Sequence, residues 1–158
     1  TLAGILHIDY RVPGSIDYLD YLKVVKIVTR SDAEVWKAYR HCLFNVIFNN
    51  KDDHSKNFSF EMTKDFKWIC APVYDLTYCS GPGGEHHMAV MGKGKSISKS
   101  DLLQLASKSG LDSKKAEAEI EKIVLVAQKA AELGEFYPIR GKTLSLINKD
   151  IQQNIKSL

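Results

Sequence analysis

The spacing of apolar positions along the first fifty residues predicts two amphipathic helices. In residues 15–28, apolar side chains recur near every third or fourth position, and Ser15 after a Pro-Gly turn is the expected N-cap. A second helix is predicted from Asp32 to about Phe48, because Ser31 and Glu34 match a capping box and a regular apolar stripe follows them. The apolar stripe of this second helix is expected to belong to the core.

The pattern changes at residue 49, where nine polar residues end the helical periodicity. Residues 49–57 are therefore predicted to form a polar loop. Residues 58–70 alternate like two short strands around a turn at 63–65, which predicts a hairpin. Pro72 ends the second strand, so the segment 72–76 should carry Asp75 back beside the polar loop.

The second half of the chain is predicted to be helical after a glycine-rich stretch at 80–96. Ser98 and Asp101 open one helix, and Gly110 closes it. Two further helices are expected at about 113–133 and 139–155, with a break at Gly134 and Pro138. The predicted fold is mainly α with one small β-hairpin, and the whole chain is expected to form a single domain.

Composition narrows the function classes only slightly. The chain has 158 residues, which suits one domain, and a formal charge of +3, too small to indicate nucleic-acid binding by itself. Three cysteines without a C-x-x-C pair suggest neither a disulfide framework nor a zinc cluster, so a reducing, cytoplasmic setting is expected. No apolar run approaches the roughly 20 residues of a membrane helix. Because Thr1 opens directly in helix-like sequence, we expect a piece of a longer protein.

The polar loop has the spacing of a phosphoryl-transfer site. Such a site needs a carboxylate that orients or accepts the proton of the attacking hydroxyl, and oxygen ligands for Mg²⁺. In protein kinases a catalytic Asp precedes a metal-binding Asn by five residues, and a second metal-binding Asp follows further on. Asp52 and Asn57 have that spacing, and Asp75 lies 23 residues after Asp52, beyond the predicted hairpin.

Several short motifs together resemble one family, the HipA-like kinases of bacterial toxin–antitoxin systems. They are Phe44-Asn45, Asn49-x-x-Asp52-Asp53-His54-x-Lys56-Asn57-Phe58, Ala71-Pro72-x-Tyr74-Asp75-Leu76 and Ser80-Gly81-Pro82-Gly83-Gly84-Glu85-His86-His87. The resemblance extends from Leu2 to about Ala116. It implies the C-terminal, catalytic helical lobe of a protein-kinase-like fold, whose N-terminal lobe has no counterpart in this sequence.

The resemblance also implies an activity, cofactors and partners. It implies ATP- and Mg²⁺-dependent phosphorylation of Ser or Thr in a protein, for instance an aminoacyl-tRNA synthetase, and a HipB-like antitoxin that would link the chain to DNA indirectly. By the same resemblance Asp52 is the catalytic residue, and Asn57 and Asp75 bind the metal. The nucleotide-contacting residues that it implies are His54, Ser55, Lys56, Asn57 and Asp75.

Other interpretations remain for individual residues and for the chain. Asp53 is expected to be an ordinary loop carboxylate, with a supporting charge as the alternative. His86 and His87 are expected to be structural or part of a substrate loop, with transition-metal ligation as the alternative. Tyr74 is expected in the core. Two other functions stay open: a non-catalytic module that binds an antitoxin, and a metal-dependent phosphohydrolase.

Overall fold

The computed structural model describes residues 1–158 and contains seven α-helices and one two-stranded antiparallel sheet. The α-helices are α1 (Leu2–Leu6), α2 (Tyr18–Thr29), α3 (Asp32–Ile47), α4 (Lys99–Lys108), α5 (Ser113–Gln128), α6 (Ala130–Glu135) and α7 (Gly141–Lys156). The strands are β1 (Phe60–Met62) and β2 (Trp68–Cys70), and two 3₁₀ turns are η1 (Ser55–Asn57) and η2 (Pro82–Gly84). The predicted mainly helical fold with a small hairpin is therefore confirmed.

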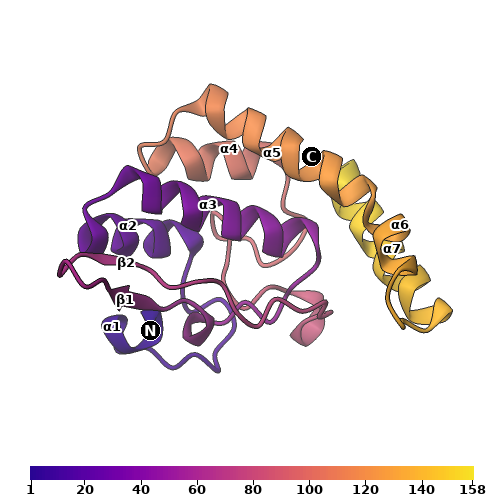
Figure 1. The fold of residues 1–158 in the computed structure, drawn as a ribbon, viewed down its shortest axis with the longest axis horizontal. Helices are drawn as coiled ribbons and strands as arrows, with labels where there is room; N and C mark the ends of the chain where they lie inside the picture. The colour runs from indigo at the N-terminus through magenta and orange to yellow at the C-terminus, as the bar shows by residue number, and fades with distance from the viewer.

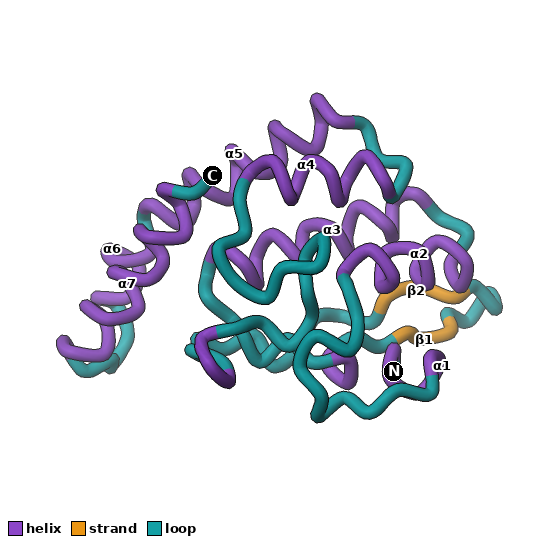
Figure 2. Tube along the Cα trace, turned by 180° about the vertical axis from the view of Figure 1, so that it is seen from behind, coloured by secondary structure: helices purple, strands orange, loops and turns teal.

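The helices form layers around α3. Figure 1 shows α2 beside α3, with the hairpin and α1 on one side of this pair and α4 and α5 on the other. The chain then leaves the body along α6 and returns along α7, so that these two helices form an arm, which Figure 2 shows from behind. No helix combines the length and apolar character that crossing a membrane requires.

The N-cap of helix α2 lies two residues later than predicted. Asp17, not Ser15, caps it, because its carboxylate accepts the backbone N–H of Leu19 at 2.8 Å. Asp17 also pairs as an isolated bridge with Ala89, so this part of the chain is extended rather than helical. The prediction was wrong because a long-range contact with the glycine-rich segment sets where the helix starts.

Helix α3 matches its predicted bounds, but its first turn is built differently. The Ser31 hydroxyl accepts the N–H of Glu34 at 3.4 Å, as the capping box requires. The Glu34 carboxylate does not return to Ser31. It accepts the backbone N–H of Cys70 at 2.9 Å and pairs with Lys37, so it ties strand β2 to the start of α3.

The core is contributed by segments that lie far apart in the sequence. Its largest fully buried side chains include Tyr18, Tyr39, Phe58, Leu102 and Ile120, from α2, α3, the end of the polar loop, α4 and α5. Burying one such side chain contributes about 1.5–3 kcal/mol relative to leaving it exposed. The polar loop is therefore held on both sides by elements that share one core.

The C-terminal helices differ from the prediction at two points. Helix α5 ends at Gln128 and a separate α6 follows, so the single helix expected at 113–133 is broken. Gly134 lies inside α6 and does not end it, because α7 packs directly against it: a Cβ on Gly134 would lie 2.3 Å from Cδ1 of Leu144. The close approach of two helices, rather than a turn, explains this glycine.

Candidate functional site

The polar loop belongs to no sheet. It makes two backbone hydrogen bonds to Cys79, in the segment that follows the hairpin. The N–H of Lys51 donates to the carbonyl of Cys79 at 3.2 Å, and the N–H of Cys79 donates to the carbonyl of Asn49 at 3.0 Å. Asn49 adopts a left-handed conformation (φ 58°) as the chain leaves α3, which Asn tolerates better than most residues. This pairing places residues 72–76 beside the polar loop, as the sequence predicted.

Asn57 joins the two segments that carry the predicted acids. Its side-chain nitrogen donates to the backbone carbonyl of Asp52 at 3.1 Å and to the carboxylate of Asp75 at 3.2 Å. Both donors of the amide are thus used inside the protein, and its oxygen makes no hydrogen bond to protein. Asp75 is solvent-exposed and left-handed (φ 55°), a strained backbone of the kind that clusters at functional sites.

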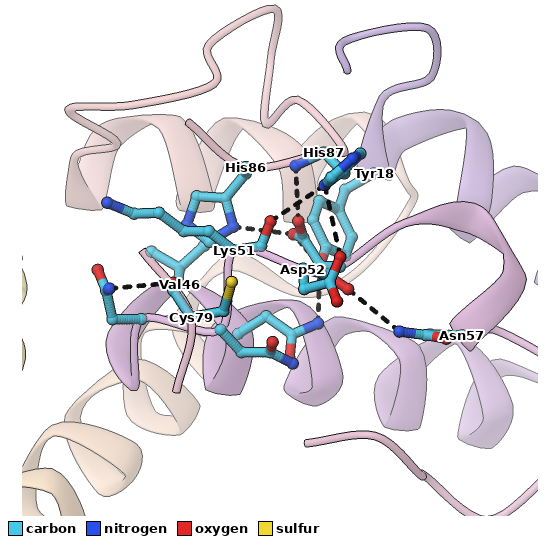
Figure 3. A network of polar contacts seen from close by, with 12 residues as sticks. Tyr18, Val46, Lys51, Asp52, Asn57, Cys79, His86 and His87 are labelled. Atoms are coloured by element: carbon cyan, nitrogen blue, oxygen red, sulfur yellow. Dashed lines mark hydrogen bonds and ion pairs between the residues drawn. The ribbon is translucent and has the colours of Figure 1, made fainter. Parts of the chain in front are cut away.

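Asp52 projects from the loop without a close partner. Its side chain is 44% exposed, and the nearest imidazole nitrogens are Nδ1 of His87 at 3.8 Å and Nε2 of His54 at 4.0 Å. Both separations are too long for hydrogen bonds. Figure 3 shows Asp52 between His87 and Asn57, and its carboxylate accepts no hydrogen bond within the protein.

The other residues predicted to contact the nucleotide differ in their burial and in their contacts. Ser55 is buried, and its hydroxyl and the Nδ1 atom of His54 have no hydrogen-bond partner. The ammonium of Lys56 lies 3.9 Å from the ring centroid of Tyr10, in a cation–π contact that holds it over the N-terminal segment. Unpartnered buried polar atoms are uncommon, and the loop concentrates them.

Asp53 is a buried structural carboxylate, so the expectation of an ordinary loop acid was wrong. It is 1% exposed and accepts three hydrogen bonds: from the Tyr18 hydroxyl at 2.7 Å, from Nδ1 of His86 at 2.9 Å and from the N–H of His87 at 2.8 Å. These contacts fasten the glycine-rich segment to the polar loop (Figure 3). They give His86 and His87 the structural role that was favoured over metal ligation.

A buried polar chain continues from Asp53 to the other acid-bearing segment. Asn45 donates to the Tyr18 hydroxyl at 2.9 Å, and Asn50 donates to Asn45 at 3.0 Å and to the carbonyl of Asp75 at 3.5 Å. Sequence reasoning assigned no role to Tyr18, Asn45 or Asn50. The available signal was an asparagine on the apolar face of a predicted helix, where a polar group must find a partner.

Burial keeps two ionisable groups near the buried Asp53 carboxylate neutral. Burial, and next the charge of Asp53, raise the pKa of Tyr18 well above its usual value, so the phenol stays a donor. Burial lowers the pKa of His41 to about 4, although Asp53 acts in the opposite direction, so His41 is neutral at pH 7. The negative charge of Asp53 is therefore stabilised mainly by its three hydrogen bonds.

Tyr74 is not a core residue, contrary to expectation. Its side chain is 40% exposed, and its hydroxyl lies 2.6 Å from both the carbonyl of Lys56 and the hydroxyl of Ser59. The segment carrying it is exposed and runs over the surface beside the polar loop. Tyr74 nevertheless fixes that segment against the loop.

The donor set suits a hard divalent cation. Asn57 offers an amide oxygen without a protein partner, and Asp75 offers an exposed carboxylate within hydrogen-bond distance of that amide. Mg²⁺ is commonly held by one or two protein oxygens together with water and substrate phosphates. The residues present therefore fit Mg²⁺ carried with a nucleotide better than an ion enclosed by protein alone.

A family model matches most of the chain, and a solved structure shares its fold. The model of the HipA-like C-terminal domain matches residues 1–131. A chain of the Shewanella oneidensis MR-1 toxin–antitoxin complex of HipA, HipB and operator DNA superposes with a TM-score of 0.73 at 19% identity; the match covers 93% of this chain and 37% of that one. At this identity the likeness shows the fold alone. The comparison with curated proteins gave no match.

Proposed function

Because the chain belongs to the HipA-like C-terminal domain family, we propose that it is the catalytic lobe of a protein kinase that transfers the γ-phosphoryl group of ATP to Ser or Thr of a protein. The contact of Asn57 with both acid-bearing segments carries this proposal. The amide donates to both the Asp75 carboxylate and the Asp52 backbone carbonyl. A phosphoryl-transfer site needs its proton acceptor and its metal ligands close together.

Each residue then has a distinct task. The hydroxyl of the acceptor attacks the γ-phosphorus, the bond to the ADP oxygen breaks, and the Asp52 carboxylate orients the hydroxyl and takes up its proton. Asn57 and Asp75 would hold Mg²⁺, which supplies charge neutralisation at the phosphates when bound. His54, Ser55 and Lys56 would contact the nucleotide, for which Lys56 must leave the ring of Tyr10.

The rest of the catalytic unit and the partners belong to the same proposal. The chain spans 37% of the superposed chain, and we place the phosphate-covering lobe in an N-terminal part of the protein. A HipB-like antitoxin is the proposed partner, since the superposed chain comes from a complex with HipB and operator DNA. An aminoacyl-tRNA synthetase is a proposed acceptor protein.

The test is phosphate transfer by the protein that carries both lobes. Asp52→Ala should lower kcat by about 10²–10⁴-fold, the usual contribution of a positioned general base. Asp75→Asn should raise the Mg²⁺ concentration needed for half-maximal rate, because one charged ligand is lost. Asp65→Ala is the matched control, since Asp65 is an exposed hairpin-turn acid without a hydrogen bond or ion pair. Undiminished transfer by the Asp52 variant would refute the assignment.

A further inference from the structure

A polar cavity lies beside the polar loop, and none of Asp52, Asn57 and Asp75 lines it. It has a volume of about 470 Å³, is open to solvent, and is lined by the end of α3, the polar loop, the glycine-rich segment and α7. Its lining includes Lys51, Lys95, Lys156, Asp150, Asn154 and His86. This volume is within the range of small-ligand pockets and suits one side chain of a bound segment.

The lining carries unbalanced positive charge. Lys51 and Lys156 take part in no ion pair, whereas Lys95 pairs with Glu85 at 2.9 Å. The one acid of the lining, Asp150, already accepts the hydroxyl of Tyr78 at 2.6 Å. Two lysines without an ion pair therefore line a cavity in which the single carboxylate already accepts a hydrogen bond.

The cavity is held in shape by contacts between distant segments. The Asn154 side chain donates to the carbonyls of Val46 and Ile47 at 3.1 and 3.3 Å, which docks α7 on the end of α3. The Ser157 hydroxyl donates to the carbonyl of Ile97 at 3.2 Å. A ligand therefore meets a lining that is already assembled and loses little free energy in ordering it.

The cavity and Asp52 share one stretch of backbone. Lys51 and Asp52 are adjacent, with Cα atoms about 3.8 Å apart across a trans peptide. Figure 3 shows the Lys51 side chain extending past His86, away from Asp52 and Asn57. A segment bound across the loop could thus place one side chain at Asp52 and another, a few residues along, in the cavity.

We propose that this cavity binds an anionic side chain, a carboxylate or a phosphate, of the protein segment whose hydroxyl is presented to Asp52. Lysine ammonium groups bind both kinds of anion as point charges. The proposal rests on the proposed function for naming the ligand as an acceptor segment. It adds a preference for acceptors that carry an acidic or already phosphorylated residue near the target Ser or Thr.

Binding can be measured without catalysis. Three fluorescent peptides, identical except for one residue that is Glu, phosphoserine or Gln, are titrated with the chain, without ATP or Mg²⁺, and followed by anisotropy. The Glu or phosphoserine peptide should bind about tenfold more tightly than the Gln peptide, the gain typical of a charge-assisted hydrogen bond. The higher-affinity peptide of the two identifies the anion as carboxylate or phosphate.

A double variant and a matched control complete the test. The double variant Lys51→Ala with Lys156→Ala should abolish the preference for the anionic peptide. Lys108→Ala, which removes an exposed lysine at the C-terminal end of α4, should retain it. Circular dichroism establishes that the double variant is folded. If that variant is unfolded, raising the salt from 0.05 to about 0.5 M in the parent replaces it, and the preference should then disappear through screening.

The outcomes separate this proposal from the kinase assignment. Equal binding of the three peptides, or a preference that survives in the folded double variant, would overturn it. A short RNA oligonucleotide that binds more tightly than any peptide, and that needs both lysines, would overturn the choice of a protein ligand. A chain that shows the preference, in a protein that transfers no phosphate, would refute the proposed function and leave the anion site standing.

Discussion

Removal of the carboxylate should destabilise the fold strongly at Asp53 and hardly at all at the adjacent Asp52. Asp53 is 1% exposed and accepts hydrogen bonds from Tyr18, His86 and the backbone of His87, at 2.7–2.9 Å. Asp53→Ala would leave two buried donors, on Tyr18 and His86, and one partly buried donor, the N–H of His87, without their acceptor. Each donor left without an acceptor costs about 1–3 kcal/mol, so three of them together should cost at least about 3 kcal/mol.

We therefore expect Asp53→Ala to lower the free energy of unfolding by about 4 kcal/mol. Asp53→Asn keeps the shape and part of the accepting capacity, so it should cost less, about 1–3 kcal/mol. Asp52→Ala is the internal control: with 44% exposure and no short hydrogen bond, its removal should stay within about 0.5 kcal/mol.

The assay is urea unfolding followed by circular dichroism, with the slope m compared between the variants so that a change in midpoint reports stability. A domain of this size should lose about 2–4 °C in Tm per kcal/mol, so the loss expected for Asp53→Ala is about 10 °C. A loss below about 1 kcal/mol for Asp53→Ala would refute the argument, because the three hydrogen bonds could then not be the main support of the glycine-rich segment. Equal losses for Asp52→Ala and Asp53→Ala would refute it as well.

Two further predictions concern stability. Burial depresses the pKa of His41 to about 4, from about 6.5 in the unfolded chain, so the unfolded state binds the proton first. The free energy of unfolding should therefore fall as the pH drops from about 6.5 towards 4, by an amount on the order of 3 kcal/mol. His41→Gln should flatten that part of the pH profile. An unchanged profile in this variant would contradict the depressed pKa of His41. Ser98→Ala should cost about 1 kcal/mol in urea unfolding, because Ser98 and Asp101 form a complete capping box at α4, whereas Ser107→Ala, at an exposed position of the same helix, should cost less than half as much.

Local signals in the sequence were enough to locate most elements. The cap at Ser31 and the apolar stripe that follows predicted α3 to within one residue, and Ser98 with Asp101 predicted the start of α4. These features depend on hydrogen bonds and side-chain spacing within a few residues, so a sequence carries them directly. The hairpin was predicted for the same reason, although its paired strands are shorter than expected.

The three predicted residues Asp52, Asn57 and Asp75 also came from spacing, and the structure brings them together through the Asn57 amide. Their chemical roles remain predictions, to be tested by phosphate transfer. The sequence motif predicted that Asn57 would lie close to the segments of Asp52 and Asp75. It did not predict that one amide would contact both acid-bearing segments, because that depends on the pairing of Cys79 with the polar loop.

Tertiary structure alone decided the role of the residues that support this site. Asp53 looked like any loop acid, and Tyr18 like any helix residue, until packing brought them within 2.7 Å of each other across 35 positions of sequence. The same holds for the start of α2 at Asp17, which a contact with Ala89 sets, and for the cavity between Lys51 and α7. Local sequence determines turns, caps and periodicity, whereas burial and its hydrogen bonds depend on which distant segments meet, and only the folded chain contains that information.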